Sequence, residues 1–152
     1  MEAVDPDILF KEVVERHRAM AEAKGLVVMM DIPEGGVPPV LADPFHLMEA
    51  MDNLVGNALK FMPKGPPVRR VVLRARPGVI EVQDEGPGFT MEDKEHAFER
   101  FRRLSAKPTA GERSTGLGLS IVKALVEAMG GEIELVSEAG QGATFRIHLG
   151  RV

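Results

Sequence analysis

Residues 42–63 read ADPFHLMEAMDNLVGNALKFMP, and the rest of the chain is organised around this stretch. Asp43 and Pro44 predict the start of a helix, because an aspartate caps free N–H groups and proline suits the first helical position. Pro63 ends the helix. An apolar stripe at helical spacing runs along it and predicts the face that meets a core: Leu47, Met51, Leu54 and Ala58.

A second face of the same helix is polar and carries Glu49, Asn53, Asn57 and Lys60. Asparagine is a poor helix former, because its amide competes for backbone hydrogen bonds. Two asparagines one turn apart therefore suggest that their oxygens face a group that needs hard ligands. Mg²⁺ with nucleotide phosphates fits, since Mg²⁺ takes few protein oxygens and leaves the rest to water and phosphate. A solvated polar face is the alternative, and this segment alone does not decide between them.

Composition narrows the class of protein. The length of 152 residues predicts a single domain, 1–152, with a real core. A net charge of -4 gives no electrostatic argument for binding nucleic acid. No apolar run reaches membrane-spanning length and Met1 opens no signal peptide, so we expect a cytoplasmic domain without membrane contact. The absence of cysteine excludes disulfides and thiolate metal sites.

Periodicity and turn residues predict an α/β two-layer sandwich, with about three main helices packed on one face of a five-stranded mixed, largely antiparallel sheet. The helix near the C-terminus has two apolar rows and is expected to be mostly buried. The main helices are predicted at 7–24, 42–63 and 115–129, with a short one within 93–103. The strands are predicted at 26–31, 71–74, 79–83, 132–136 and 143–149.

Residues 82–89, VQDEGPGF, place an aspartate at a strand end before two glycines. The Asp84 carboxylate is suited to accept a hydrogen bond from an amine such as the exocyclic N6 of adenine. Gly86 and Gly88 would let the backbone approach a flat ring without a Cβ in the way. A plain turn is the alternative.

Two further stretches suit anion binding. Residues 97–104, AFERFRRL, combine Phe98 and Phe101 as anchors with Arg100, Arg102 and Arg103 for phosphates; a solvated basic turn is the alternative. Residues 114–122, STGLGLSIV, lead glycines into a helix, whose first N–H groups form an anion site. A glycine-containing loop before a buried helix is the alternative. The spacing is neither that of a Walker loop nor that of a Rossmann fingerprint.

Taken together and in this order, NLVGNALKF, DEGPGF, FERF and TGLGLSIVKALVEAMGG resemble the ATP-binding catalytic domain of sensor histidine kinases. That domain belongs to a superfamily shared with DNA gyrase, the mismatch-repair ATPases and the heat-shock chaperone ATPases. The resemblance covers essentially the whole chain. It implies a Bergerat-type ATP-binding fold, with ATP and Mg²⁺ as cofactors.

The resemblance also implies roles for individual residues. Asn57 corresponds to the metal ligand, and Asn53, Lys60 and Arg103 join it as the catalytic set around the phosphates. Phe61 takes an aromatic place against the nucleotide that is often tyrosine, and Ser114 stands where glycine is common. The remaining expected nucleotide-binding residues are Asp84 with Gly86 and Gly88 at the adenine, Phe98 and Phe101 in an ATP lid spanning 85–115, and Thr115, Gly116, Leu117 and Gly118 around the phosphates.

The activity implied by the resemblance is transfer of the γ-phosphoryl group to a histidine on a separate dimerisation domain, with a response regulator reached indirectly. None of the four histidines lies in the family's His-Glu-x-x-x-Pro motif, so we expect that domain to be absent and the chain to be a monomer. Asn53 replaces the glutamate base of the hydrolysing relatives, and an amide does not take a proton. The alternatives are a serine kinase of the anti-sigma-factor type and a non-catalytic ATP-binding adaptor.

Overall fold

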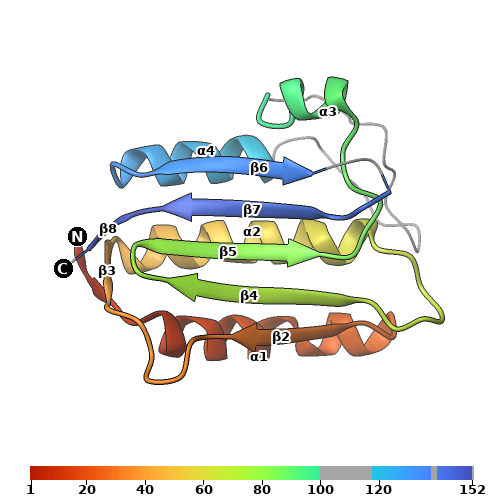
Figure 1. The fold of residues 1–152 in the computed structure, drawn as a ribbon, viewed down its shortest axis with the longest axis horizontal. Coiled ribbons are helices and arrows are strands. Elements are labelled where there is room, and N and C mark those ends of the chain that lie inside the picture. The colour runs from red at the N-terminus through yellow and green to blue at the C-terminus, as the bar shows by residue number, and fades with distance from the viewer. Residues whose placement is uncertain (100–117, 138–139, 152) are drawn as a thin grey trace.

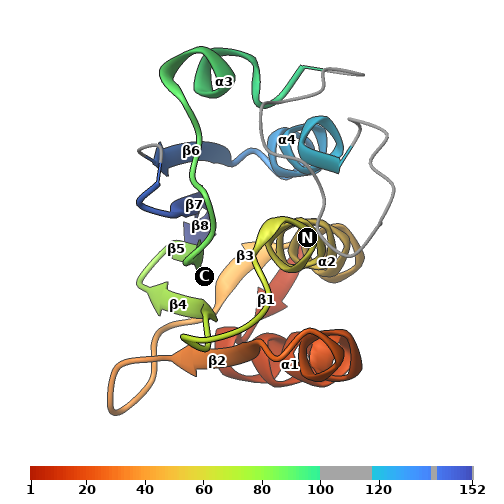
Figure 2. The same ribbon diagram turned by 90° about the vertical axis from the view of Figure 1, so that its right-hand side faces the viewer.

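The structure is a computed structural model that describes residues 1–99, 118–137 and 140–151. It has two layers, with three long helices covering one face of a five-stranded sheet (Figure 1, Figure 2). This is the sandwich expected from the sequence. The long helices are α1 (Pro6–Ala23), α2 (Pro44–Phe61) and α4 (Gly118–Ala128).

The main sheet has the strand order β2-β4-β5-β7-β6. β2 pairs with β4 in parallel, and the other three pairs are antiparallel, which confirms the mixed, largely antiparallel sheet. The strands are β2 (Val27–Asp31), β4 (Arg70–Arg76), β5 (Val79–Asp84), β6 (Glu132–Ser137) and β7 (Ala143–His148).

A second, three-stranded sheet was not predicted. It consists of β1 (Glu2–Val4), β3 (Val40–Ala42) and β8 (Gly150–Arg151) in the order β1-β3-β8. Strands of two or three residues are too short to show a periodicity, so the sequence carries no signal for them. This sheet brings the two ends of the chain together at one end of the molecule (Figure 1).

Helix α2 lies between α1 and α4 and forms the centre of the helical layer (Figure 2). Its start is as predicted: the Asp43 carboxylate accepts hydrogen bonds from the backbone N–H groups of Phe45 and His46, and Pro44 is the first helical residue. The predicted apolar stripe is buried, since none of its four residues is more than 7% exposed. The polar face of α2 is thereby held in a fixed orientation.

Helix α4 is less buried than its sequence indicated. Val122 and Val126 are fully buried, but Ile121 is 37% exposed and Ala128 is also exposed. The expectation of a mostly buried helix is therefore wrong. The physical reason is position: within the described part of the chain, α4 is at the end of the helical layer and has a neighbouring helix, α2, on one side (Figure 2).

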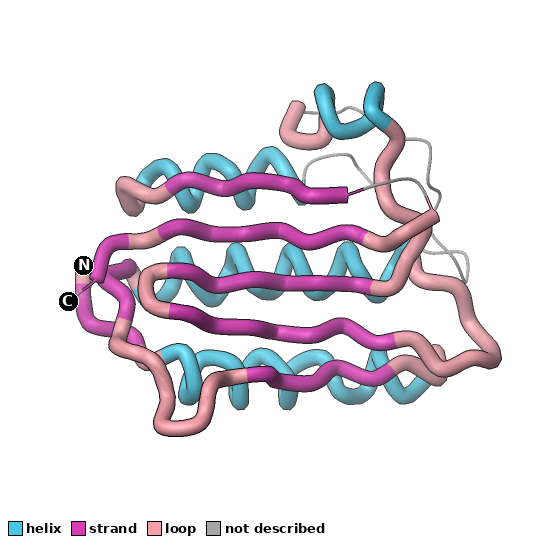
Figure 3. The backbone as a smooth tube through the Cα atoms, in the orientation of Figure 1, coloured by secondary structure: helices cyan, strands magenta, loops and turns pink. Residues whose placement is uncertain are grey.

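The other face of the sheet is not covered by the helices (Figure 3). One row of side chains crosses all five strands in register with alternating charge: Asp31, Arg74, Glu81, Arg146 and Glu134. Arg74 Nε lies 3.0 Å from Asp31 Oδ2, and Arg146 Nε lies 2.9 Å from Glu81 Oε1. Arg76 and Arg146 both pair with the Glu81 side chain, which explains how an acidic residue is buried at this position.

The short helix α3 (Met91–His96) begins two residues before the predicted 93–103 and ends well before it. The remainder of that prediction, from residue 100, is outside the described residues. No helix among the described residues is long and apolar enough to span a bilayer.

Candidate functional site

The polar face of α2 is directed at the first residue of α4. A Cβ built on Gly118 would lie 3.0 Å from Asn57 Nδ2 and 3.3 Å from Asn57 Oδ1. A side chain at residue 118 would therefore push the Asn57 amide by a few tenths of an ångström, and glycine leaves the amide in its present position. The structure thus brings together two stretches that are about sixty residues apart in the sequence, as the prediction of a shared phosphate site requires.

One turn earlier on α2, Asn53 Nδ2 donates a hydrogen bond to the Glu49 backbone oxygen at 2.9 Å. The donor end of this amide is engaged with its own helix, so its oxygen is the end suited to a cation or a hydrogen-bond donor. Lys60 and Phe61 are in the last turn of the same helix, and both are partly buried.

Asp84 is the last residue of β5 and is partly buried. Burial raises the pKa of its carboxyl to about 6, although hydrogen bonds from the backbone N–H groups of Gly86 and Ala143 act in the opposite direction. The Gly86 N–H donates to Asp84 Oδ1 at 2.9 Å. A carboxylate that is held by two N–H groups and is costly to ionise is a natural partner for a ligand that brings a further donor.

The loop after Asp84 is shaped by glycine. A Cβ on Gly86 would lie 3.0 Å from Asp84 Oδ1 and 3.3 Å from Met62 Cγ, so the residue that ends α2 approaches the aspartate closely. Gly88 has φ +69°, which places it in the left-handed region. Asp84 and Asn57 are therefore at the same end of the molecule, separated by the last turn of α2.

The β6–β7 connection supports this loop, a role that the sequence did not reveal. Ser137 Oγ accepts a hydrogen bond from Phe89 N at 2.8 Å and donates one to Gly142 O at 2.7 Å. A Cβ on Gly142 would lie only 2.3 Å from Asp84 O. Nothing in the local sequence pattern shows which strand end the connection between β6 and β7 packs against.

Phe98 anchors the first part of the predicted lid to the sheet. Its ring meets that of Phe145 edge-on with the centroids 6.2 Å apart, and Lys123 Nζ lies 5.8 Å from the Phe98 centroid. Phe89 makes a similar contact with Phe145 at 5.9 Å. The other residues predicted for the lid and the phosphate loop are outside the described residues: Phe101, Arg103, Thr115, Gly116 and Leu117.

The donor set restricts the kind of metal site. Among residues 1–99, 118–137 and 140–151, no group of three or more histidine, cysteine or acidic side chains is placed to hold an ion. A divalent ion at this end would take the Asn57 oxygen and obtain its other ligands from phosphate and water. That set of ligands fits Mg²⁺, which commonly binds through one or two protein oxygens and substrate phosphates.

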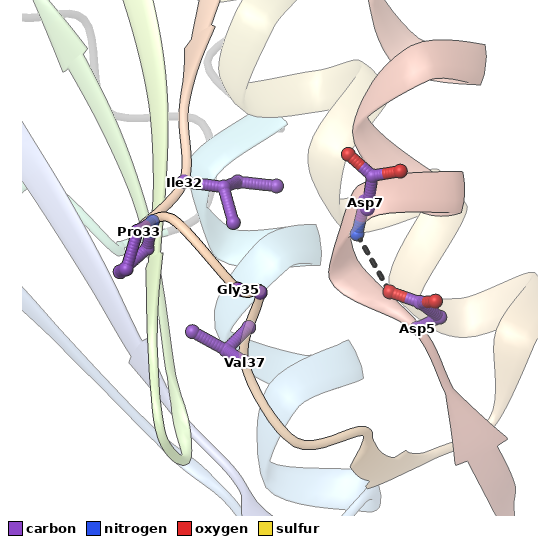
Figure 4. A pocket seen from close by; sticks show the side chains of 7 residues that line it. Asp5, Asp7, Ile32, Pro33, Gly35 and Val37 are labelled. Atoms are coloured by element: carbon purple, nitrogen blue, oxygen red, sulfur yellow. Dashed lines mark hydrogen bonds between the residues drawn. The ribbon is translucent and has the colours of Figure 1, made fainter.

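A cavity of about 440 Å³ at the other end of the molecule is not part of this site (Figure 4). It lies between the start of α1 and the β2–β3 connection, and Asp5 and Asp7 line it. Both acids have local partners, because Asp5 accepts from the Asp7 N–H and Asp7 is paired with Lys11 at 2.9 Å. Among the described residues, two acidic ones and no basic one line this cavity, which suits the phosphates of a nucleotide poorly.

Residues 42–151 match the family model described as histidine kinase-, DNA gyrase B-, and HSP90-like ATPase. The chain belongs to this family, and it is therefore an ATP-binding domain of that type. Its relatives include the sensor-like histidine kinase SenX3 of Mycolicibacterium smegmatis, with 38% identity over 151 residues. The match takes in 98% of the chain but only 38% of SenX3, so the chain spans well under half the length of that relative.

Solved structures agree with this assignment. Full-length ShkA, solved in complex with AMPPNP, matches with a TM-score of 0.78 at 30% identity over 99% of this chain and 32% of ShkA. The mycobacterial sensor histidine kinase MprB matches with a TM-score of 0.75 at 28% identity, over 99% of this chain and 100% of the solved one. The resemblance inferred from the sequence motifs is confirmed.

Proposed function

We propose that this chain is the catalytic domain of a sensor histidine kinase, which binds Mg-ATP and transfers the γ-phosphoryl group to a histidine on a separate dimerisation domain. A response regulator would then receive the group from that histidine. The observation that carries the proposal is the placement of Asp84 and Asn57 at one end of the molecule, each against a glycine that leaves room for its polar side chain. The names of the relatives support the class of reaction.

In this proposal, the ionised Asp84 carboxylate accepts a hydrogen bond from the adenine amine, and Asn57 Oδ1 ligates the metal. Bound Mg²⁺ would neutralise charge that develops on the phosphate oxygens. Lys60 serves the same purpose from the last turn of α2, and Arg103 is expected to do so from outside the described residues. The contribution of the chain is therefore orientation and charge neutralisation.

The proposed transfer is a substitution at the γ-phosphorus. A ring nitrogen of the acceptor imidazole forms a bond to the γ-phosphorus, the bond from that phosphorus to the β–γ bridging oxygen breaks, and ADP leaves. The imidazole proton passes to solvent. Asn53 offers no base for a water molecule, since an amide does not accept a proton, so an external nucleophile is favoured over hydrolysis.

A titration with ATP, with and without Mg²⁺, tests the binding half of the proposal. We expect binding in the micromolar to millimolar range that Mg²⁺ strengthens, and we expect Asn57→Ala to lose the Mg²⁺ effect while Asp84→Asn loses binding altogether. Asp31→Asn, an exposed carboxylate on the open sheet face, is the matched control and should bind as the wild type does. Absence of binding up to millimolar ATP would favour the non-catalytic adaptor.

Labelled ATP tests the transfer half. The chain alone should acquire no acid-labile label, and adding the histidine-bearing domain of the same kinase should produce it on that domain. Acid-stable label on a protein substrate would instead indicate a serine kinase of the anti-sigma-factor type. We also propose that the domain acts in the cytoplasm and as a monomer when separated from its dimerisation helices.

A further inference from the structure

The C-terminal end of helix α2 lies at the proposed nucleotide site, and the polarity of that end is unfavourable for binding an anion. Its C-terminal turn carries Lys60 and Phe61, and its terminal residue Met62 approaches Gly86 beside Asp84. The carboxyl end of a helix carries a partial negative charge, because the last carbonyl groups have no N–H partner within the helix. In a nucleotide bound between Asp84 and Asn57, the phosphates at Asn57 would lie about one turn from this negative end, whereas anions normally bind at the positive end of a helix.

The backbone leaves the helical conformation directly after this last turn. The Met62 N–H reaches back to Ala58 O at 3.1 Å, and Met62 itself is extended, with φ -75° and ψ 134°. The chain therefore leaves the helix without the left-handed glycine that commonly supplies further backbone donors at a helix end. The oxygens of Leu59 and Lys60 follow in the same turn.

Lys24 donates hydrogen bonds to this helix end from a different helix. Its ammonium group donates hydrogen bonds to Leu59 O and to Lys60 O, the latter at 3.2 Å. Lys24 is only 5% exposed, which is unusual for a lysine. Helices α1 and α2 run side by side in both views, with their C-terminal ends on the same side of the molecule (Figure 1, Figure 2).

The end of α1 fixes the position of this lysine. The Gly25 N–H donates to Glu22 O at 3.1 Å and the Leu26 N–H to Ala21 O at 2.8 Å, with Gly25 at φ +68°. This pair of hydrogen bonds is the Schellman arrangement, which stops a helix sharply at a glycine. Lys24 is the last residue before that glycine, so its backbone is held while its side chain extends to α2.

We infer that Lys24 is a positioning residue for nucleotide binding: it holds the last turn of α2 and cancels the negative helix end that would otherwise repel the phosphates. This inference depends on the proposed binding of ATP between Asp84 and Asn57. In this inference Lys24 acts through the backbone of Leu59 and Lys60, to which it donates hydrogen bonds. Its electrostatic effect should therefore grow with the charge of the ligand.

A ligand series separates this electrostatic role from a purely structural one. Lys24→Met keeps the length of the side chain and removes its charge, and we expect it to weaken ATP binding by about tenfold at low salt. Adenosine, which carries no phosphate, should bind within about twofold of the wild type, with ADP intermediate. The difference between ATP and adenosine should narrow as the salt concentration is raised.

Lys11→Met is the matched control, because it removes the same charge from the other end of α1, where Lys11 is exposed and paired with Asp7. Lys24→Arg should preserve the discrimination between ATP and adenosine, and Lys24→Gln should lose it. These two variants replace Lys24→Met if that protein does not fold. Equal weakening for all three ligands, or no weakening for any, would overturn the inference.

The role of Lys24 can also be tested on the unmodified chain. The ¹⁵N resonance of the Lys24 ammonium group should shift more on addition of ADP than on addition of adenosine, and an identical response to both would contradict the inference. Failure of the wild type to bind any nucleotide would instead refute the proposed function. The two failures are thus distinguishable.

Discussion

Replacing Asp84 with asparagine should stabilise the nucleotide-free chain at neutral pH while abolishing nucleotide binding. Burial raises the pKa of Asp84 from 3.8 to about 6. The folded state therefore binds a proton more tightly than the unfolded state does, and the free energy of unfolding falls as the pH rises from about 4 to about 6, with no further change above. The ionised carboxylate at neutral pH is a cost to the fold.

The size of that cost follows from the two pKa values. At roughly 1.4 kcal/mol for each pH unit, the difference corresponds to at most about 3 kcal/mol. About 2 kcal/mol of it develops between about pH 4.5 and about pH 8, since unfolded aspartate is already largely ionised at the lower value. Asparagine loses one of the two hydrogen bonds from Gly86 and Ala143, at about 1 kcal/mol, but this loss does not depend on pH.

Urea unfolding of wild type and Asp84→Asn without nucleotide, at about pH 4.5 and about pH 8, measures the effect. The variant should gain about 2 kcal/mol relative to wild type on going to the higher pH. Glu85→Gln is the control: the hydrogen bond from Arg70 lowers the pKa of the exposed Glu85 carboxyl, so its removal should give no gain. A gain for Asp84→Asn that is the same at both pH values would refute the desolvation argument.

One pH series and three substitutions test the rest of the site. Adenosine affinity should fall by up to about tenfold for each pH unit below about 6, because the ionised Asp84 carboxylate is a stronger acceptor for the adenine amine than the protonated carboxyl group; a flat profile in calorimetric titrations would contradict this. Gly118→Ala should displace the Asn57 amide and weaken Mg-ATP by about tenfold, with adenosine unaffected as the internal comparison. Asn53→Glu should raise the steady ATPase rate, because a glutamate at this position can accept a proton from water. An unchanged rate of phosphate release would contradict the argument that Asn53 disfavours hydrolysis. Ser137→Ala should lower the free energy of unfolding by about 1–3 kcal/mol, measured by urea titration, because the buried Gly142 carbonyl and the partly buried Phe89 N–H lose their partner.

Local sequence patterns were sufficient wherever a residue acts within its own element. Asp43 caps α2 as predicted, because a cap is a contact over two or three residues. His17 Nε2 lies 3.0 Å from Asp52 Oδ1. Its placement on the apolar stripe of α1 was visible in the sequence, but the identity of its partner on α2 was not.

The sequence by itself determined the helical and strand periods, the two-layer fold and the identity of the polar residues at the predicted site, since these depend on neighbours within a turn or a strand. Only the tertiary structure decided which polar residues act together. The pKa of Asp84, the contact of Asn57 with Gly118 and the reach of Lys24 to the end of α2 all join segments far apart in the chain. Desolvation, steric exclusion and compensation of a helix dipole arise from packing in three dimensions, and no spacing along the chain records them.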